Sequence, residues 1–244
     1  MKVQIGTYNI QHGVDRLHYL KTKEWKVDLP AVVNAIQTME LDICGLQEVY
    51  DHDSLDGGKE QAKVIGEQLG YYYAFAKGSV YRWGECGNAL VSKFPILSTR
   101  LIPMQVPMEK RIEGAYYDDR VMLVAELSIN GRTVTVVCTH FGLHADELNL
   151  AVDSVREVVK EIKTPMIFMG DLNFGPNEHY YGRLCEVMTD TATLMKVSDN
   201  TFPSEAPNNR IDYIFVNDQV KVLDACVPEL IVTDHRPYKI VVDI

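Results

Sequence analysis

Short polar signatures border hydrophobic runs at five places along this chain of 244 residues, and this arrangement constrains its fold more than any other feature. They are Tyr8-Asn9 after VQIGT, Gln47-Glu48 after LDICGL, Asp171-Leu172-Asn173 after PMIFMG, Asp212-Tyr213 before IFV, and Asp234-His235 after ELIVT. A continuous apolar run is typical of a strand buried on both faces, and polar groups at its end lie at the edge of the sheet core. Five such ends could converge on one pocket.

The residue types in these signatures indicate a particular chemistry. The oxygens of Asn, Glu and Asp are hard ligands that suit Mg2+ or Mn2+. The side chains of Asp171, Asp212 and His235 can also transfer protons. This combination favours attack on a phosphate ester.

The rest of the chain alternates between strand and helix patterns. We expect strands at residues 2–9, 41–47, 71–76, 88–93, 121–129, 132–140, 165–171, 211–217, 220–227 and 237–243, and helices at 29–39, 59–69, 148–162 and 177–187. Asn130-Gly131 is a two-residue hairpin signal between two strands, so at least one pair is antiparallel and the sheets are mixed. The pattern predicts an α/β sandwich in a single domain over residues 1–244.

Composition narrows the class of protein. No apolar run approaches the roughly 20 residues of a membrane span, so no membrane anchor is expected. The N-terminus enters a strand directly and lacks the features of a signal peptide, and we therefore expect a cytoplasmic protein. A monomer is also expected. The five cysteines are an odd number and are widely spaced, which favours core-filling thiols over disulfides.

The charge balance bears on the substrate. The formal net charge is -10, and the basic clusters are limited to Lys21, Lys23 and Lys26 and to Lys110-Arg111, all expected in loops. Proteins that follow a duplex backbone usually present clustered Lys and Arg. Extended duplex DNA is therefore not expected as a partner, whereas a single-stranded nucleic acid remains compatible.

Short strings along the chain resemble one known family. They are TYNI (7–10), LQEV (46–49), GNALVSKFPI (87–96), CTHF (138–141), GDLN (170–173), TFPS (201–204), RIDYIFV (210–216) and TDHRP (233–237). The residues of these segments and their order along the chain resemble those of the endonuclease/exonuclease/phosphatase superfamily, in particular of its small bacterial members. The resemblance implies a four-layer α/β sandwich, in which two mixed β-sheets pack face to face and are flanked by helices.

The resemblance also implies a metal site. The Glu that matches Glu48 is the main Mg2+ ligand of the family, and the matching Asn9 supports the metal and the phosphate. Asp234 matches a carboxylate on the metal side. Taken alone, Glu48 could equally be a strand-end carboxylate in water or in a salt bridge.

Further roles concern proton transfer and the phosphate. Asp171 matches the general base, and Asp212 matches the carboxylate that orients His235, which faces the developing negative charge. His140 matches a histidine that contacts the phosphate.

The roles of Asn173 and Arg120 each have an alternative interpretation. Asp171 and Asn173 are two apart, so on extended backbone they point the same way, and Asn173 would hold the water or a phosphate oxygen; an Asx turn competes with this interpretation. Arg120 matches a phosphate-binding Arg, with a surface ion pair as the equal alternative.

Substrate choice is expected to depend on the loops 11–28, 77–87 and 104–119, which carry aromatic and Arg side chains including Arg82 and Trp83. His12 is the remaining histidine expected near the site, because it follows the Asn9 strand. We expect a Mg2+-dependent or Mn2+-dependent phosphodiesterase for a small or single-stranded phosphate compound. The alternatives are a nuclease, a lipid or sugar-phosphate phosphatase, and an inactive phosphate-binding module.

Overall fold

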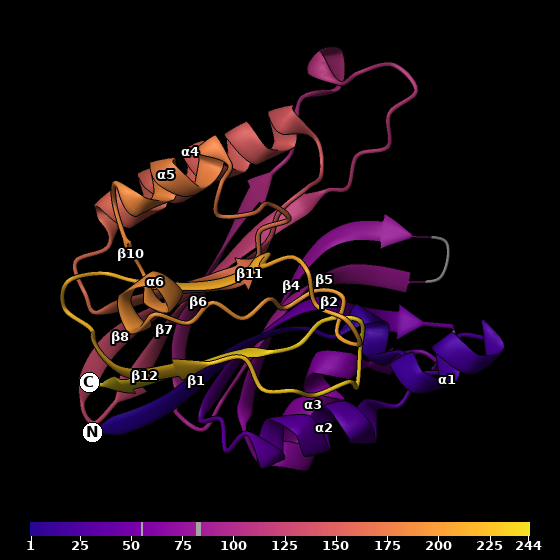
Figure 1. Cartoon of the computed structure of the whole chain (residues 1–244), viewed down its shortest axis with the longest axis horizontal. Coiled ribbons are helices and arrows are strands. Elements are labelled where there is room, and N and C mark those ends of the chain that lie inside the picture. Colours follow the sequence, from indigo (N-terminus) through magenta and orange to yellow (C-terminus); the bar gives the residue numbers. More distant parts are fainter. Residues whose placement is uncertain (55, 82–83) are drawn as a thin grey trace.

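The computed structural model describes residues 1–54, 56–81 and 84–244 (Figure 1). Arg82 and Trp83, expected in a substrate loop, lie outside the described residues. Within them, no helix is long and apolar enough to cross a membrane.

Two mixed sheets form the centre of the molecule. In spatial order, the first contains β12 (Lys221–Cys226), β13 (Tyr238–Asp243), β1 (Lys2–Asn9), β2 (Ile43–Asp53), β5 (Gly84–Ser92) and β4 (Tyr72–Tyr81), with the short β3 (Lys59–Glu60) beside β2. The second contains β10 (Thr189–Asp190), β11 (Asp212–Val216), β9 (Met166–Asp171), β8 (Arg132–His140), β7 (Arg120–Ile129) and β6 (Ile96–Met104). The central pair of each sheet, β1 with β2 and β8 with β9, is parallel, and the other pairs are antiparallel. Asn9, His140 and Asp171 stand at the carboxyl ends of β1, β8 and β9, whereas Glu48 lies within β2.

Helices cover the outer face of each sheet (Figure 1). On the first sheet, α2 (Leu29–Thr38) and α3 (Gln61–Leu69) bury side chains such as Val32 and Ile65 with Leu46. On the second, α4 (Ala145–Glu161) and α5 (His179–Cys185) bury side chains such as Val152 with Phe168. A third apolar cluster fills the space between the sheets. The predicted four-layer α/β sandwich is therefore confirmed.

Several predicted boundaries were wrong. Residues 77–87 were expected to form a loop, but β4 continues to Tyr81 and β5 begins at Gly84. Strand β6 was missed, and the loop expected at residues 11–28 contains α1 (Arg16–Thr22), which has no buried residue. A short helix that was not expected, α6 (Thr191–Met195), lies between β10 and β11 in the chain.

The five cysteine thiols differ in their burial. All five cysteines are free, and Cys44, Cys86 and Cys138 are buried as expected, whereas Cys185 and Cys226 are exposed. The core-filling prediction was therefore wrong for these two.

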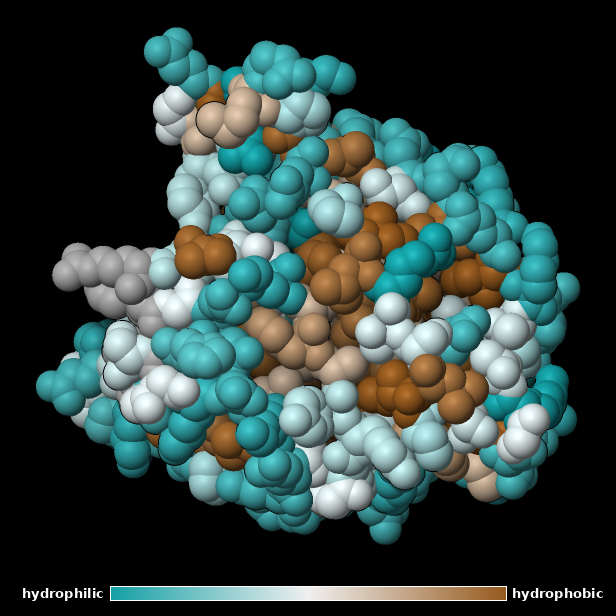
Figure 2. All heavy atoms as spheres, turned by 180° about the vertical axis from the view of Figure 1, so that it is seen from behind, coloured by the Kyte–Doolittle hydropathy of each residue, from teal (hydrophilic) through white to brown (hydrophobic). Residues whose placement is uncertain are grey.

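Figure 2 shows the back of the molecule, where an apolar area in the centre of the face is surrounded by hydrophilic side chains.

Candidate active site

Three neighbouring strands of the second sheet place His140, Asp171 and Asp212 side by side. Asp171, the last residue of β9, is in register with His140 at the end of β8 and with Asp212 at the start of β11. The close approach of β9 to β8 requires a glycine at position 170, because a Cβ there would lie 2.0 Å from the Thr139 carbonyl oxygen. The sheet register thus gathers side chains that are far apart in the sequence.

Asp171 is the centre of this group and is almost completely buried. Its Oδ2 accepts a hydrogen bond from Asn9 Nδ2 at 3.0 Å and lies 3.5 Å from Nε2 of both His140 and His235. Burial raises the pKa of Asp171 to about 7, against the opposing effect of the positive His235. A carboxylate with a pKa near neutrality is suited to accept a proton at physiological pH.

His235 lies between Asp171 and Asp212, and Asp212 orients its ring. His235 Nδ1 lies 2.9 Å from Asp212 Oδ2, and both side chains are buried. Burial alone would lower the pKa of His235, but the carboxylates of Asp212 and Asp171 raise it to about 10. At neutral pH His235 is therefore an imidazolium, and its Nε2–H can donate to a negative oxygen.

Glu48 reaches the site by a backbone irregularity that the sequence did not reveal. The strand was expected to end at residue 47, but β2 continues to Asp53, and the register with β5 shifts between Leu46 and Val49. Glu48 lies in this bulge with a left-handed φ of 52°. A bulge redirects a side chain that regular pleating would aim elsewhere, and here the Glu48 carboxylate accepts a hydrogen bond from Asn9 Nδ2 at 3.1 Å.

Asn9 thus joins two carboxylates, because its Nδ2 donates to both Glu48 and Asp171. Its Oδ1 accepts from the Gln11 amide at 3.0 Å. An amide oxygen has two lone pairs, so one is still free for a cation. In this structure, however, the visible effect of Asn9 is to orient its two neighbours.

Asn173 departs from the extended geometry that the spacing predicted. β9 ends at Asp171, and Asn173 has a left-handed φ of 54°. Its amide donates to Asp171 Oδ1 at 3.0 Å, which is the Asx turn that competed with the extended interpretation. The Asn173 side chain nevertheless enters the site, where Nδ2 lies 3.0 Å from His140 Nε2.

Asp234 lies on the side of Glu48. Thr233 ties this segment to β1, since its hydroxyl donates to the Asn9 carbonyl at 2.9 Å. Burial, reinforced by the charge of Glu48 and opposed by His235, raises the pKa of Asp234 to about 6. A cation binds favourably beside a carboxylate whose ionisation is disfavoured by burial and by a neighbouring negative charge.

The donor set fits a hard divalent cation. Among the described residues, Asp234 Oδ1 is buried and has no hydrogen-bond partner, although a buried carboxylate oxygen without a partner is costly. Asp171, Asp212 and His235 also come close enough together to hold an ion. The protonated His235 disfavours that second position at neutral pH, because an imidazolium offers no lone pair. Glu48 and Asp234 are therefore the better pair.

The phosphate-contact candidates lie beside Glu48. Arg120 Nη1 lies 2.9 Å from His140 Nδ1, and Arg120 Nη2 lies 2.9 Å from Asp118 Oδ2. Burial, together with the positive Arg120, holds the pKa of His140 well below its ordinary value. Arg120 Nε is buried and has no hydrogen-bond partner within the described part of the chain. Arg120 does pair with Asp118, but both side chains are largely buried, so the pair is not a surface one.

A cavity of about 170 Å³ opens next to these residues. It is lined by His12, Glu48, Tyr50, Tyr81, Cys86, Asp118, Arg120 and His140. His12 was expected near the site, and its Nε2 lies 3.5 Å from Glu48 Oε2. Tyr81 was expected in a substrate loop and lines this cavity. The sequence interpretation missed Asp118 as a component of the site, because it was considered only as the partner of a surface ion pair.

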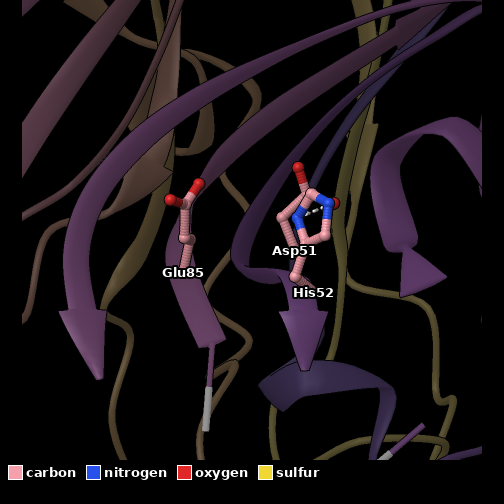
Figure 3. A group of neighbouring side chains, drawn as sticks. All are labelled: Asp51, His52 and Glu85. Carbon is pink, nitrogen blue, oxygen red and sulfur yellow. Dashed lines mark ion pairs between the residues drawn. The ribbon is translucent and has the colours of Figure 1, made fainter. Parts of the chain in front are cut away.

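A second group of metal-binding residue types lies further along β2 and β5. Figure 3 shows Asp51 and His52 together on one strand and Glu85 on the other, and His52 Nδ1 lies 3.9 Å from Asp51 Oδ1. Glu85 already pairs with Lys77 at 3.1 Å, and His52 is largely exposed. We assign this group no role in the reaction.

Comparison with known proteins places the chain among its relatives. The model of the Endonuclease/Exonuclease/phosphatase family matches residues 6–235. Protein cwh43 of Schizosaccharomyces pombe is 25% identical over 168 residues, which cover 68% of this chain but 15% of that protein. Protein YbhP of Escherichia coli K12 is 23% identical over 225 residues and 86% of each chain.

Solved structures share the fold. A family protein from Bacteroides thetaiotaomicron has a TM-score of 0.81 at 19% identity, with 100% of this chain and 99% of that one covered. A mannosyl-6-phosphatase from the same species, Bt3783, has a TM-score of 0.77 at 18% identity, with 99% of this chain and 100% of that one covered. At these identities the likeness concerns the fold.

Proposed function

We propose, on the premise that this chain belongs to the Endonuclease/Exonuclease/phosphatase family, that it is a divalent-metal-dependent phosphodiesterase for a small or single-stranded phosphate compound. The observation that carries the proposal is the convergence of Asp171, a buried carboxylate with a pKa of about 7, with His235, an imidazolium with a pKa of about 10. Their facing atoms are 3.5 Å apart. A base and a charged donor in one pocket match the needs of phosphoester hydrolysis.

In the proposed reaction, water attacks phosphorus and the bond to the leaving oxygen breaks. Asp171 Oδ2 orients the water and accepts its proton, because Asn9 and Asn173 hold the carboxylate in place. His235, fixed by Asp212, donates to an oxygen on which negative charge develops. Arg120 and His140 contact the remaining phosphate oxygens from the side of the cavity.

Glu48 and Asp234 would hold the cation, with Asn9 orienting Glu48. When bound there, Mg2+ or Mn2+ would supply positive charge to the phosphate and would polarise the phosphoryl group. The oxygen donors of this pair are of the hard type that both ions prefer.

The charge of the cavity favours a diester over a monoester. A diester carries one negative charge, whereas a monoester carries close to two at neutral pH. Of the described residues that line the cavity, Arg120 is the one Lys or Arg, and Asp118 already neutralises much of its charge. A second full negative charge would find no further Lys or Arg among the described residues of this lining.

A matched pair of chromogenic substrates tests this proposal. We expect bis(p-nitrophenyl) phosphate to be cleaved with Mg2+ or Mn2+ and p-nitrophenyl phosphate to be cleaved much more slowly. A wider panel of single-stranded DNA, RNA, sugar phosphates and lipid phosphodiesters would then rank natural substrate classes. Faster cleavage of the monoester would replace the diesterase with a phosphatase, and inactivity of the whole panel with every metal would favour a binding module.

A further inference from the structure

A hydrogen-bonded chain leads from the rim of the cavity to His140. Asp118 lies at its centre and uses its two oxygens differently. Oδ1 accepts hydrogen bonds from the hydroxyls of Tyr81, of Tyr116 at 2.9 Å and of Ser79 at 3.3 Å, whereas Oδ2 pairs with Arg120 Nη2 at 2.9 Å. Three donors on one oxygen fix the plane of the carboxylate and therefore the direction of the guanidinium.

The backbone next to Asp118 is equally fixed. The Asp119 amide donates to Ser79 Oγ at 2.7 Å, which ties the start of β7 to β4. The two segments approach closely at Gly78, where a Cβ would lie 2.3 Å from the Asp119 carbonyl oxygen. Burial and the nearby Asp118 raise the pKa of the Tyr81 hydroxyl, so it remains a donor at physiological pH.

At the inner end of this hydrogen-bond network, both ring nitrogens of His140 face hydrogen-bond donors. Arg120 Nη1 lies 2.9 Å from Nδ1, and Asn173 Nδ2 lies 3.0 Å from Nε2. A neutral imidazole has one acceptor nitrogen and one N–H, so it can accept only one of these two hydrogen bonds.

The arginine decides which nitrogen accepts. A guanidinium has no acceptor atom and keeps its protons, and its hydrogen bonds are charge-assisted and strong. Asn173 Nδ2 has a second acceptor, the Phe141 carbonyl oxygen at 2.9 Å. The contact between Asn173 and Nε2 is therefore the one that yields, and Nε2 carries the hydrogen.

We infer that Asp118 is a positioning residue which, with Tyr81 and Tyr116, holds Arg120 against His140 Nδ1, so that His140 presents Nε2–H to a phosphoryl oxygen. In the absence of substrate, Asp171 Oδ2 at 3.5 Å is the nearby acceptor. His140 thus acts as a neutral donor and not as a second base. The part of this inference that concerns the phosphoryl oxygen rests on the proposed function, whereas the tautomer does not.

The tautomer can be measured without any substrate. Long-range 1H–15N NMR spectra of the full-length protein with 15N-labelled histidine distinguish the two neutral tautomers, and a His140→Asn variant identifies the signal. We expect the Nε2–H form at pH 7.5. A signal of the Nδ1–H form would overturn the inference even if the enzyme proved active, and the Nε2–H form in a protein without phosphoesterase activity would reject the proposed function alone.

Two neighbouring carboxylates supply a matched comparison. Asp118→Asn should release the guanidinium, produce a mixture of His140 tautomers and lower kcat by roughly 10-fold to 100-fold, with a smaller change in KM. Asp119→Asn should change neither, because Asp119 pairs with Arg111 and not with Arg120. If Asp118→Asn does not fold, Tyr116→Phe removes one donor from an exposed side chain and should shift the tautomer in the same direction. An unaltered tautomer and kcat in the variant that folds would contradict a positioning role.

Discussion

The imidazole of His235 and the carboxylate of Asp212 form a buried pair, with Nδ1 and Oδ2 2.9 Å apart and side-chain exposures of 5% and 0%. The residues come from the start of β11 and from the loop before β13, so the two sheets must pack together before the pair can form. The carboxylate both selects the direction of the ring and keeps it charged. The pair therefore behaves as one unit in the proposed reaction.

If the pair is a unit, the effects of its substitutions overlap. Asp212→Asn and His235→Ala should each lower kcat by roughly 10²-fold to 10⁴-fold, as expected for a positioned charged donor and its support. The double variant should be only slightly worse than His235→Ala. Strictly multiplicative losses in this double-mutant cycle would show that the two residues act independently.

The rate should depend on pH through two groups. Asp171 must be ionised, so activity falls as the pH drops below its pKa of about 7. The charge of a bound cation would lower this pKa and would move the acidic limb of the pH–rate profile to lower pH. His235 must be protonated, so activity also falls above its pKa of about 10. We expect kcat/KM, measured with the diester and Mg2+, to be highest between the two limbs.

A variant of Asp212 tests whether His235 causes the loss of activity at high pH. Asp212→Asn removes a carboxylate that raises the pKa of His235, so the residual activity of the variant should decline at lower pH than that of the wild type. An identical upper limb in both proteins would assign it to a group other than His235.

The sequence was sufficient for the fold class, because buried strands leave a strong apolar pattern. It also singled out Asn9, Asp171 and His235, which the structure brings together. It was insufficient where tertiary contacts determine local structure. Strand β6 contains Ser, Thr, Arg and Pro103 and lies at the edge of its sheet, where proline is tolerated, so its apolar pattern is weak. α1 is short and buries no residue, and it therefore has no apolar stripe to detect.

The same limit applies to the site. The left-handed φ of Glu48 is rare for a Glu, and no local signal announces the bulge that contains it. Asn173 adopts this region more readily, and its Asx turn was the alternative that the sequence left open. Asp118 next to Arg120 resembles an ordinary surface ion pair in the sequence. Its low exposure reflects the packing of Tyr81, which comes from β4 and is distant in the sequence.

The glycine at position 170 offers a test of the strand packing under the site. Gly170→Ala would bring a methyl group to 2.0 Å from the Thr139 carbonyl oxygen, so β8 and β9 would have to separate. We expect the free energy of unfolding to fall by about 3 kcal/mol or more, measured by denaturant titration. Gly182→Ala in α5 meets no atom within 4 Å and should stabilise the protein by up to about 1 kcal/mol. Similar stability of the two variants would show that the strands can yield at position 170.

Charge predicts weak binding to duplex DNA. With a net charge of -10, the protein should bind a duplex at physiological salt no more tightly than the non-specific range of about 10⁻⁴ to 10⁻⁶ M. Fluorescence anisotropy with a labelled duplex at several salt concentrations measures this. Tight binding that weakens steeply with salt would move a nuclease ahead of the proposed small-substrate enzyme.

Metal dependence is the sharpest test of the role of Glu48. EDTA should abolish activity, and Mg2+ or Mn2+ should restore it, whereas Ca2+ should support it poorly. Glu48→Gln keeps the shape of the side chain but removes its charge, so half-maximal activity should require at least about 10-fold more Mg2+, with partial recovery at high concentration. Glu85→Gln is the matched control, because Glu85 belongs to the other group of candidate ligands on the same sheet and pairs with Lys77. If the Mg2+ requirement changed in Glu85→Gln and not in Glu48→Gln, the cation would have to be placed beside Asp51 and His52, away from Asp171, and the proposed reaction would lose its metal site.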